Sequence, residues 1–368
     1  MTALRADVAI IGGGLAGLCA ARRLRALGQH DVVILEARSR FGGRIQSMGL
    51  PNSPDRFDVG ATWFWPDMQP EVMALVMQLG LTVDAQHEQG HWTFERRADL
   101  PAVQAAGYAL SPPAMRLRGG MMALVDALVA ETPLASQRLG HEVTALSRHG
   151  DRVHVQAIQV SGERVDLDVG KVLLALPPRL VAERVSFSPP LPAALHRAWQ
   201  QCATWMAPHA KYVAVYPTPF WRDRGLSGAA RSAAGPMAEI HDASASQHGA
   251  LFGFLGVPAV WRETVEQADM IRLCRAQLCR LFGAQAEHPV AEFLQDWARD
   301  PHTATDADRT STGEHPQRPK AESDSGEWVG RLFGAGSEWS RSHAGYLAGA
   351  VDAAESAVDA LLRKRLDP

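Results

Sequence analysis

The stretch that decides the fold is DVAIIGGGLAG at residues 7–17, close to the N-terminus. Residues 7–11 form a short apolar run that suits a buried strand, and apolar residues recur with helical spacing over residues 15–27, up to Gly28. A second apolar run follows at residues 31–35. The order of strand, glycine turn, helix and strand predicts a βαβ unit of the Rossmann type.

The glycines between the first strand and the helix have the spacing G-x-G-x-x-G, which is typical of dinucleotide binding. Gly12 allows a tight turn, Gly14 lets the backbone approach a pyrophosphate, and Gly17 lets helix and strand pack closely. Glu36 ends the second strand, where a carboxylate can accept hydrogen bonds from a ribose 2′-hydroxyl and repels a 2′-phosphate. A solvated charge at the strand end is the alternative interpretation of Glu36. The residues expected to face the phosphates are Gly12, Gly14, Leu15, Ala16 and Gly17.

The segment that begins at Glu36 favours FAD over NAD as the dinucleotide. A second pair of glycines, Gly42 and Gly43, permits another close approach of the backbone, and the neighbouring arginines can neutralise pyrophosphate charge. The residues of this segment expected to bind the cofactor are Glu36, Ala37, Arg38, Gly42, Gly43 and Arg44.

At this point the chain resembles the flavin-containing monoamine oxidase family, and the resemblance recurs along most of the chain in the family's order. DVGATW at residues 58–63 is similar to the segment that passes beside the flavin ring. AKYVAVY at residues 210–216 is similar to the strand that carries the family's active-site lysine. Further similar segments are GGM 119–121, HEV 141–143, ALPP 175–178, FSPPLP 187–192, PFWR 219–222, RLFGAGSE 331–338, GYL 345–347 and GAV 349–351.

The resemblance implies an α/β fold in which a Rossmann-like FAD-binding domain is combined with a discontinuous second domain, of α+β type, for the substrate. The FAD-binding domain is expected at residues 1–66, 116–205 and 328–368. The substrate domain is expected at residues 67–115 and 206–327.

The resemblance also implies which residues form the site. Lys211 is expected to be catalytic, and Tyr346 to be one of two aromatic rings beside the substrate amine. The other ring should fall near residues 306–307, which carry no ring, and residues 64–118 leave room for only a small lid. FAD is expected to be non-covalent, because no cysteine follows Cys279, where the covalent members have one. The remaining residues expected to bind FAD are Gly60, Ala61, Thr62, Trp63, Val143, Trp297, Gly336, Ser337 and Leu347.

Lys211 lies in an apolar strand of a chain with only four lysines, so burial is expected to lower its pKa. The alternative is a strand lysine whose ammonium reaches solvent. Alternation along strands predicts that Met237, Glu239 and His241 point the same way, as do Phe252 and Phe254 on the next strand. The resemblance places Glu239 and His241 at positions that line the substrate cavity, so Glu239, His241, Phe252 and Phe254 are expected to bind the substrate, with a solvent-exposed face as the alternative for Glu239 and His241.

The implied reaction is hydride transfer from the carbon next to an amine nitrogen to flavin N5, with reoxidation by dioxygen to hydrogen peroxide. Three alternatives stay open from the sequence. The enzyme could be a flavin dehydrogenase or desaturase of the same fold, or an oxidase of reduced nicotinamides. The chain could also be a flavin-binding module with little turnover.

Composition excludes several classes of protein. The chain has 368 residues and a formal net charge of −3, with no basic stretch that alternates with aromatic residues, so nucleic acid is not expected as a partner. Its apolar runs are too short to cross a membrane, and a cytoplasmic location is expected. The four cysteines have no metal-binding spacing and are expected in the core, and no metal site or Ser-His-Asp set is apparent. The sequence gives no indication of the oligomeric state.

Periodicity predicts the other elements. Helices are expected at residues 71–79, 121–131, 272–282 and 345–365, strands at 153–160, 164–168, 211–216, 237–241 and 251–255, and a surface loop at 303–327.

Overall fold

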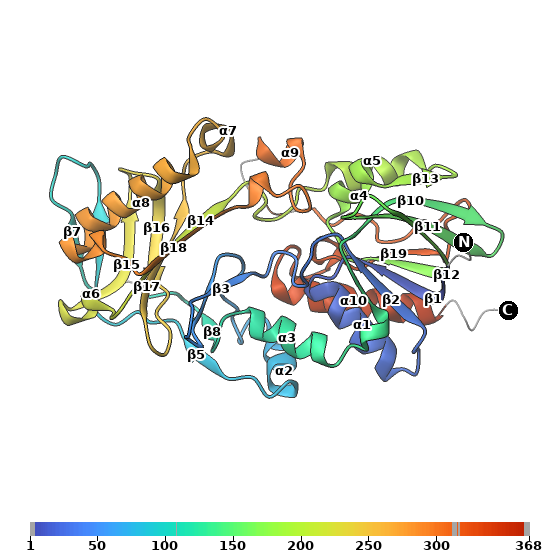
Figure 1. Cartoon of the computed structure of the whole chain (residues 1–368), viewed down its shortest axis with the longest axis horizontal. Coiled ribbons are helices and arrows are strands. Elements are labelled where there is room, and N and C mark those ends of the chain that lie inside the picture. The colour runs from blue at the N-terminus through green and yellow to red at the C-terminus, as the bar shows by residue number, and fades with distance from the viewer. Residues whose placement is uncertain (1–3, 108, 311–314, 316, 364–368) are drawn as a thin grey trace. The chain divides into compact units, whose positions relative to one another are not determined.

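The computed structural model describes residues 4–107, 109–310, 315 and 317–363. The chain forms two compact units, each made of separate stretches of sequence (Figure 1). The first unit comprises Met1–Arg44, Leu124–Ala207 and Pro301–Pro368, and the second comprises Ile45–Ala123 and Pro208–Asp300.

The division into units differs from the expected domain boundaries. Residues 45–66 and 116–123 belong to the second unit, and residues 206–207 and 301–327 belong to the first. The 58–63 segment therefore packs in the second unit, although it was expected in the FAD-binding domain. The helix at residues 306–309 packs in the first unit, although it was expected in the substrate domain.

The first unit is built on a parallel core with an antiparallel extension. Strands β1 (Leu4–Ile11), β2 (Val32–Glu36) and β12 (Arg164–Leu174) run parallel, with β1 in the centre. The predicted βαβ unit is confirmed, and its helix α1 (Leu15–Ala26) packs against α10 (Leu347–Arg363), beside which it lies in Figure 1. The full sheet has the order β13-β10-β11-β12-β1-β2-β9, and β19 also pairs with β12. The other strands are β9 (Gln137–Leu139), β10 (His141–His149), β11 (Arg152–Gln159), β13 (Ser186–Ser188) and β19 (Leu332–Gly334).

Short helices complete the first unit, and its sheet is buried by apolar side chains such as Ala9, Leu35, Val155 and Val172. The helices are α3 (Met122–Ala130), which begins in the second unit, α4 (Pro178–Arg184), α5 (Ala193–Gln201) and α9 (Asp306–Arg309), with 3₁₀ turns at Leu134–Ser136 and Ser337–Trp339.

The second unit is built on a seven-stranded sheet with the order β18-β14-β17-β16-β15-β6-β7. Helix α8 (Gln267–Phe282) covers one face, where Cys274 and Leu278 pack with Tyr212 and Ile240. Residues on the other face pack against the segment after β4 (Arg56–Asp58). The sheet strands are β6 (His91–Glu95), β7 (Val103–Ala105), β14 (Ala210–Tyr216), β15 (Leu226–Ser232), β16 (Met237–Asp242), β17 (Gly249–Leu255) and β18 (Ala291–Asp296). The remaining elements are β3 (Ser47–Gly49), β5 (Val83–Ala85), β8 (Met115–Leu117), α2 (Pro70–Gln78), α6 (Phe220–Asp223), α7 (Ala259–Arg262) and the 3₁₀ turns Ala284–Glu287 and Trp297–Arg299.

Each helix and strand expected from periodicity is present, as far as the described residues extend, but the strand expected at 164–168 continues to Leu174 and the helix expected at 272–282 begins at Gln267. The surface loop expected at 303–327 is wrong in part, because α9 lies within it and Asp308 is fully buried. The Asp308 carboxylate accepts hydrogen bonds from the Arg179 guanidinium at 2.5 Å and from the Thr204 amide at 3.0 Å. The polar composition of this segment gave no sign of burial, because its buried side chain is Asp308, a charged residue that is paired with Arg179.

Three of the four cysteines are buried, and Cys279 is partly buried. Among the residues that the structure describes, no helix is long and apolar enough to cross a membrane.

Candidate functional site

The glycine turn after β1 distinguishes glycines that the fold requires from one that it does not. Gly12 has φ +104°, and a Cβ there would lie 2.5 Å from the Ala175 carbonyl oxygen. A Cβ on Gly17 would lie 2.0 Å from the Gly12 carbonyl oxygen, so close packing of helix and strand excludes any side chain. Gly14 differs, because its φ is −75° and a Cβ would meet nothing nearer than 3.8 Å. The space in front of Gly14 fits a cofactor backbone that approaches at this point.

Glu36 is bound into the same turn rather than exposed to solvent. Only 3% of the residue is exposed, and its carboxylate accepts the Gly13 amide at 2.7 Å and the Arg38 amide at 2.9 Å. The alternative of a solvated strand-end charge is therefore wrong. A carboxylate has lone pairs beyond these two bonds, so Glu36 can also accept a ribose hydroxyl.

The second pair of glycines lies against the first turn. The Gly42 amide donates to the Gly13 carbonyl at 2.9 Å, and Gly43 has φ +58° with its Cβ position 3.3 Å from the Gly14 Cα. The Arg40 guanidinium donates to the Gly43 carbonyl at 3.1 Å, which holds this loop. The two glycine motifs thus form one continuous backbone surface in the first unit.

Arg44 is already neutralised by a carboxylate of the C-terminal motif. Its guanidinium donates to Glu338 at 2.6 and 3.1 Å, to the Ser337 hydroxyl at 3.0 Å and to the Trp205 carbonyl at 3.2 Å. Burial acts to lower the pKa of Arg44, but the charge and hydrogen bond of Glu338 outweigh it and the pKa is raised. Glu338 is fully buried, and although its burial acts to raise its pKa, Arg44 brings that pKa below the ordinary value. Arg44 therefore connects the glycine loop to Ser337, next to Gly336, and the pair of Arg44 and Glu338 carries no net charge.

Tyr346 lies immediately before α10, whose first residue is Leu347. Two other rings surround Tyr346. The Trp205 and His315 rings are 3.6 Å apart and nearly parallel, and the Tyr346 hydroxyl is 3.2 Å from Nε2 of His315. Burial raises the pKa of Tyr346. The sequence shows that no ring lies near residues 306–307, but it did not indicate Trp205 and His315, because neither lies in a motif.

Lys211 is the most unusual side chain of the second unit. Only 2% of it is exposed, and its Nζ donates to the Gly60 carbonyl at 3.2 Å and to the Thr62 hydroxyl. Nζ also lies 4.0 Å from the centre of the Phe252 ring, within the range of a cation–π contact. The alternative of an ammonium that reaches solvent is therefore wrong.

The pKa of Lys211 is lowered to about 7. Burial is the main cause, the charge of Asp58 opposes it, and Arg116 lowers the pKa further. Asp58 is itself buried, and burial raises its pKa although Lys211 acts to lower it. Its carboxylate accepts the Ser47 hydroxyl at 2.5 Å and the Met121 amide at 2.8 Å. Asp58 was not predicted as a site residue, and its position as the first residue of the DVGATW segment was the available signal.

Lys211 shares one face of the sheet with the residues expected to bind the substrate. Lys211 and Glu239 are both paired with Phe254 in the sheet, and His241 is paired with Phe252. The Glu239 carboxylate and Nε2 of His241 are 2.7 Å apart. His241 is buried, whereas the Glu239 side chain is 32% exposed, so the alternative of a solvent-exposed face is wrong for His241.

The prediction that Met237 points the same way as Glu239 is wrong. The register of β16 shifts between these two residues, and Met237 packs with Ile240 on the face covered by α8. An irregularity of this kind inserts an extra residue and reverses the alternation, which the sequence pattern did not reveal.

Two tryptophans border the same region. The Trp63 ring lies 4.7 Å from His241 and 5.2 Å from Phe252, and its Nε1 donates to Gln86 at 2.7 Å. Trp297 is buried, and its Nε1 donates to the Val59 carbonyl at 3.2 Å. The structure therefore brings the 58–63 segment, Lys211, Trp297 and the pair of Glu239 and His241 together within the second unit. Of the remaining predicted residues, Ala61 lies in the 58–63 segment, and Val143 is a buried residue of β10 at a register shift of the first unit.

Comparisons with known proteins agree with this geometry. The model of the family described as flavin containing amine oxidoreductase matches residues 84–362, and that of a Rossmann-like NAD(P)-binding domain matches residues 10–79. Putrescine oxidase of Kocuria rosea is 26% identical, and the alignment covers 83% of this chain and 85% of that protein. A protein described as a putative flavin-containing monoamine oxidase of Mycobacterium tuberculosis is also 26% identical, over 95% of both chains.

Solved structures show the same fold. Putrescine oxidase bound to putrescine matches with a TM-score of 0.81 at 21% identity, covering 98% of this chain and 100% of that one. Cyclohexylamine oxidase of Brevibacterium oxydans matches with a TM-score of 0.82 at 18% identity and the same coverage. The sequence alignment with the Kocuria rosea protein spans 426 positions although it includes only part of this 368-residue chain, so this chain lacks segments that the relative contains.

Proposed function

This chain belongs to the flavin-containing amine oxidoreductases, and from this premise we propose that it oxidises small diamines or polyamines in preference to simple monoamines. Membership makes the protein an FAD-dependent oxidoreductase of the amine oxidase type, whose family acts on amines with dioxygen. The choice among amines is the further step.

The observation that supports this choice is a carboxylate on the Lys211 face of the second unit. Glu239 is partly exposed there, beside a wall of rings formed by Trp63, Phe252 and His241. A diamine carries a second ammonium, and a carboxylate beside apolar rings can bind such a group through charge-assisted hydrogen bonds. The Arg231 guanidinium lies 3.6 Å from Glu239, but both side chains are partly exposed, so this pair contributes little and a substrate ammonium can compete with it. The relative named putrescine oxidase is consistent with a diamine as substrate.

The protein's contribution to the reaction is to orient groups and to hold a proton. When bound, FAD supplies the acceptor for a hydride from the carbon beside the amine nitrogen and passes the electrons to dioxygen. Because the pKa of Lys211 is about 7, its Nζ can hold or release a proton near neutral pH. The Gly60 carbonyl and the Thr62 hydroxyl fix the position of Nζ. The apolar rings around it exclude water.

The cofactor residues are proposed from the fit of the first unit. Gly14 leaves room for a pyrophosphate, and Glu36 remains able to accept a ribose hydroxyl. We propose that the FAD is non-covalent, and precipitation of the protein with acid should then leave all the flavin in the supernatant. Flavin that stays with the pellet contradicts this. A cytoplasmic location and the aromatic role of Tyr346 stay predictions from the sequence.

The test of the proposed function is anaerobic reduction of the bound flavin by amines. The rate is measured from the loss of flavin absorbance. The panel pairs straight-chain diamines of three to six carbons with monoamines of the same length. Matched lengths keep the apolar contact constant, so a difference reports the second ammonium. We expect diamines to reduce the flavin at least tenfold faster at equal subsaturating concentration. Equal rates for both series contradict the preference for diamines, and no reduction by any amine contradicts amine oxidation itself.

A further inference from the structure

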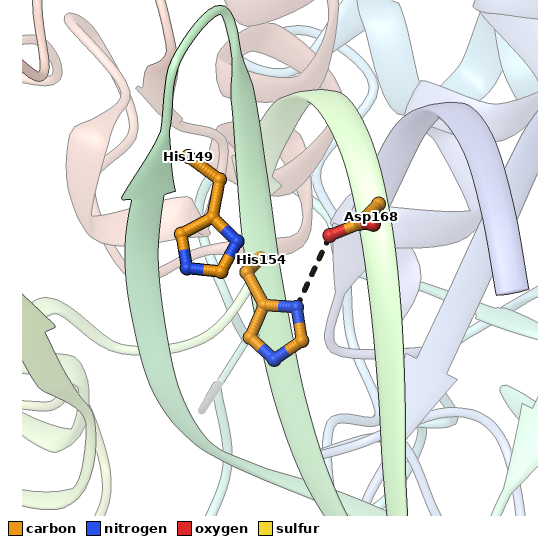
Figure 2. Close-up of side chains that lie close together, drawn as sticks. All are labelled: His149, His154 and Asp168. Carbon is orange, nitrogen blue, oxygen red and sulfur yellow. Dashed lines mark hydrogen bonds and ion pairs between the residues drawn. The ribbon is translucent and has the colours of Figure 1, made fainter. Parts of the chain in front are cut away.

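A cluster of two histidines and an aspartate lies on the antiparallel extension of the first unit. His149 ends β10, His154 lies in β11 and Asp168 lies in β12 (Figure 2). In the sheet, His149 is paired with Arg152 and His154 is paired with Asp168. Because paired residues and residues two apart share a face, all three side chains extend from the same side of the sheet.

The ligand atoms of this cluster are close enough to share one ion. One ring nitrogen of each histidine and a carboxylate oxygen of Asp168 all lie within 4.8 Å of one another. Nδ1 of His154 and Oδ1 of Asp168 are 3.1 Å apart, which Figure 2 shows as a dashed line. Two ligands at about 2.1 Å from a tetrahedral ion are separated by about 3.4 Å, so this edge of a site is nearly formed already.

We propose that His149, His154 and Asp168 bind a divalent transition-metal ion, with Zn²⁺ as the ion that suits them best. Two imidazoles and one carboxylate are a ligand set that Zn²⁺ accepts, whereas Ca²⁺ and Mg²⁺ prefer oxygen ligands alone. The cluster faces solvent at His149, so water can occupy the fourth position. The ion would connect the three strands β10, β11 and β12.

The other nitrogen of His154 lies near a second carboxylate. Nε2 of His154 lies 3.4 Å from Oδ1 of Asp166, two residues before Asp168 on the same strand. Histidines that bind metals usually direct their second ring nitrogen at a carboxylate or carbonyl, and Asp166 is close enough to serve as that group. Arg164 also donates to Asp166, at 3.2 Å, and this leaves the Asp168 carboxylate as the metal ligand.

The nearby arginines are directed at backbone oxygens. The Arg152 guanidinium donates to the carbonyls of Ala6 and Asp168 at 2.9 and 2.8 Å, and Arg148 donates to the carbonyls of Gly150 and Arg152. These contacts leave the Asp168 carboxylate to His154.

One change is needed when the ion binds. The His149 and His154 rings are stacked 4.9 Å apart with their planes only 16° from parallel, and two imidazoles that bind one ion must both direct a nitrogen at it. His149 is exposed at the end of its strand, next to the turn at Gly150, so its ring is able to rotate. We therefore expect His154 and Asp168 to contribute most of the affinity.

The test begins with FAD-loaded protein from which a chelator has removed metals. Zn²⁺ alone is then titrated into this protein, and calorimetry measures the binding. The variants are His149→Gln, His154→Gln and Asp168→Asn. The matched control is His141→Gln, which removes a histidine of the same strand β10 whose ring is bonded to the Leu139 carbonyl and to Gln159. A second control, Cys279→Ser, removes the partly buried thiol.

We expect one Zn²⁺ to bind the wild type and both controls with equal affinity, and at least tenfold more weakly in His154→Gln and Asp168→Asn. His149→Gln should weaken Zn²⁺ binding by a smaller factor. Because this variant changes an exposed side chain, its weaker binding cannot be attributed to misfolding. Equal Zn²⁺ binding by all variants, or none by the wild type at 100-fold excess over protein, overturns the proposal. Anaerobic reduction by amines should be unchanged in His149→Gln, so the outcome is independent of the proposed oxidase function.

Discussion

The glycine turn of the first unit and the Lys211 face of the second unit are built by opposite means. The turn depends on residues that are neighbours in sequence, and its geometry is fixed because a Cβ at Gly17 would lie 2.0 Å from backbone. The Lys211 face depends on strands β14, β16 and β17, which are brought together only by the fold. Local steric exclusion can be recognised in a sequence pattern, whereas a shared face depends on register and on every irregularity along the strands.

The two regions also differ in what the protein does with charge. Beside the glycine turn, the buried carboxylate of Glu338 is paired with Arg44. In the second unit, Lys211 donates hydrogen bonds to the neutral oxygens of Gly60 and Thr62, and its pKa falls to about 7 as a result of burial. Perturbed groups of this kind are typical of sites that transfer protons. The comparison therefore predicts that changes in the first unit affect binding of FAD and changes in the second affect rates.

The largest expected effect is at Gly14. The fold leaves space for a Cβ there, so Gly14→Val should fold and should bind FAD at least 1000-fold more weakly, about 4 kcal/mol. The reason is that the branched side chain fills the space that the pyrophosphate requires. The measurement is flavin content after purification, followed by titration of the apoprotein with FAD.

Gly17→Ala is the matched control, because its Cβ has no space in the fold itself. It should lower the thermal midpoint of the apoprotein, whereas Gly14→Val should leave that midpoint nearly unchanged. Normal flavin content in Gly14→Val would remove the glycine turn from the cofactor site.

The sequence predicted features that depend on neighbouring residues better than features that depend on contacts made by the fold, for a physical reason. The βαβ unit, Glu36 at the end of its strand and the burial of Lys211 were all expected from residue type and spacing. The direction of Met237 was not, because a register shift has no signature in apolar alternation. The buried pair of Arg179 and Asp308 was missed because two charged residues far apart in sequence each look like surface residues.

The second effect is a change of stability with pH that comes from Lys211. Its pKa is about 7 in the folded protein and about 10.5 ordinarily, so between these values the unfolded chain binds the proton and the folded protein does not. Stability that involves this group therefore rises with pH from 7 to 10.5 and is constant below 7. Relative to Lys211→Met, the wild type should lose about 3 kcal/mol of unfolding free energy as the pH falls from 10 to 7.

Denaturant unfolding of both proteins at saturating FAD measures this difference, because the other titrating groups are common to both and cancel. A difference that does not change between pH 10 and 7 means that Lys211 keeps its proton in the folded protein. Lys211 would then keep its charge in the folded protein, as the Arg44 and Glu338 pair does.

The third effect concerns rates. Lys211→Met keeps the length and apolar volume of the side chain but removes the proton and the donors to Gly60 and Thr62. FAD should still bind, and reduction by amine or reoxidation by dioxygen should slow at least tenfold, about 1.4 kcal/mol in the barrier. Stopped-flow absorbance measures the two steps separately. If both rates remain within about twofold of the wild type, Lys211 has a structural role only.

The smallest effect is expected at Glu239, because its side chain is 32% exposed and solvent weakens its interaction with a substrate ammonium. Glu239→Gln keeps the shape and removes the charge, so the preference for diamines over monoamines of equal length should fall about fivefold, about 1 kcal/mol. The matched control is Glu292→Gln on strand β18, which removes a carboxylate from the opposite face of the same sheet. The Glu292 carboxylate accepts hydrogen bonds from Tyr212 and Arg275 on the face covered by α8. That variant should leave the preference unchanged even if it lowers stability.

The decisive quantity is the ratio of anaerobic reduction rates for the two series of amines, because a general loss of activity cancels in it. A ratio that is equal in wild type and Glu239→Gln would show that the second ammonium, if recognised at all, is bound by another group, and the Lys211 face would then select substrates by its rings alone.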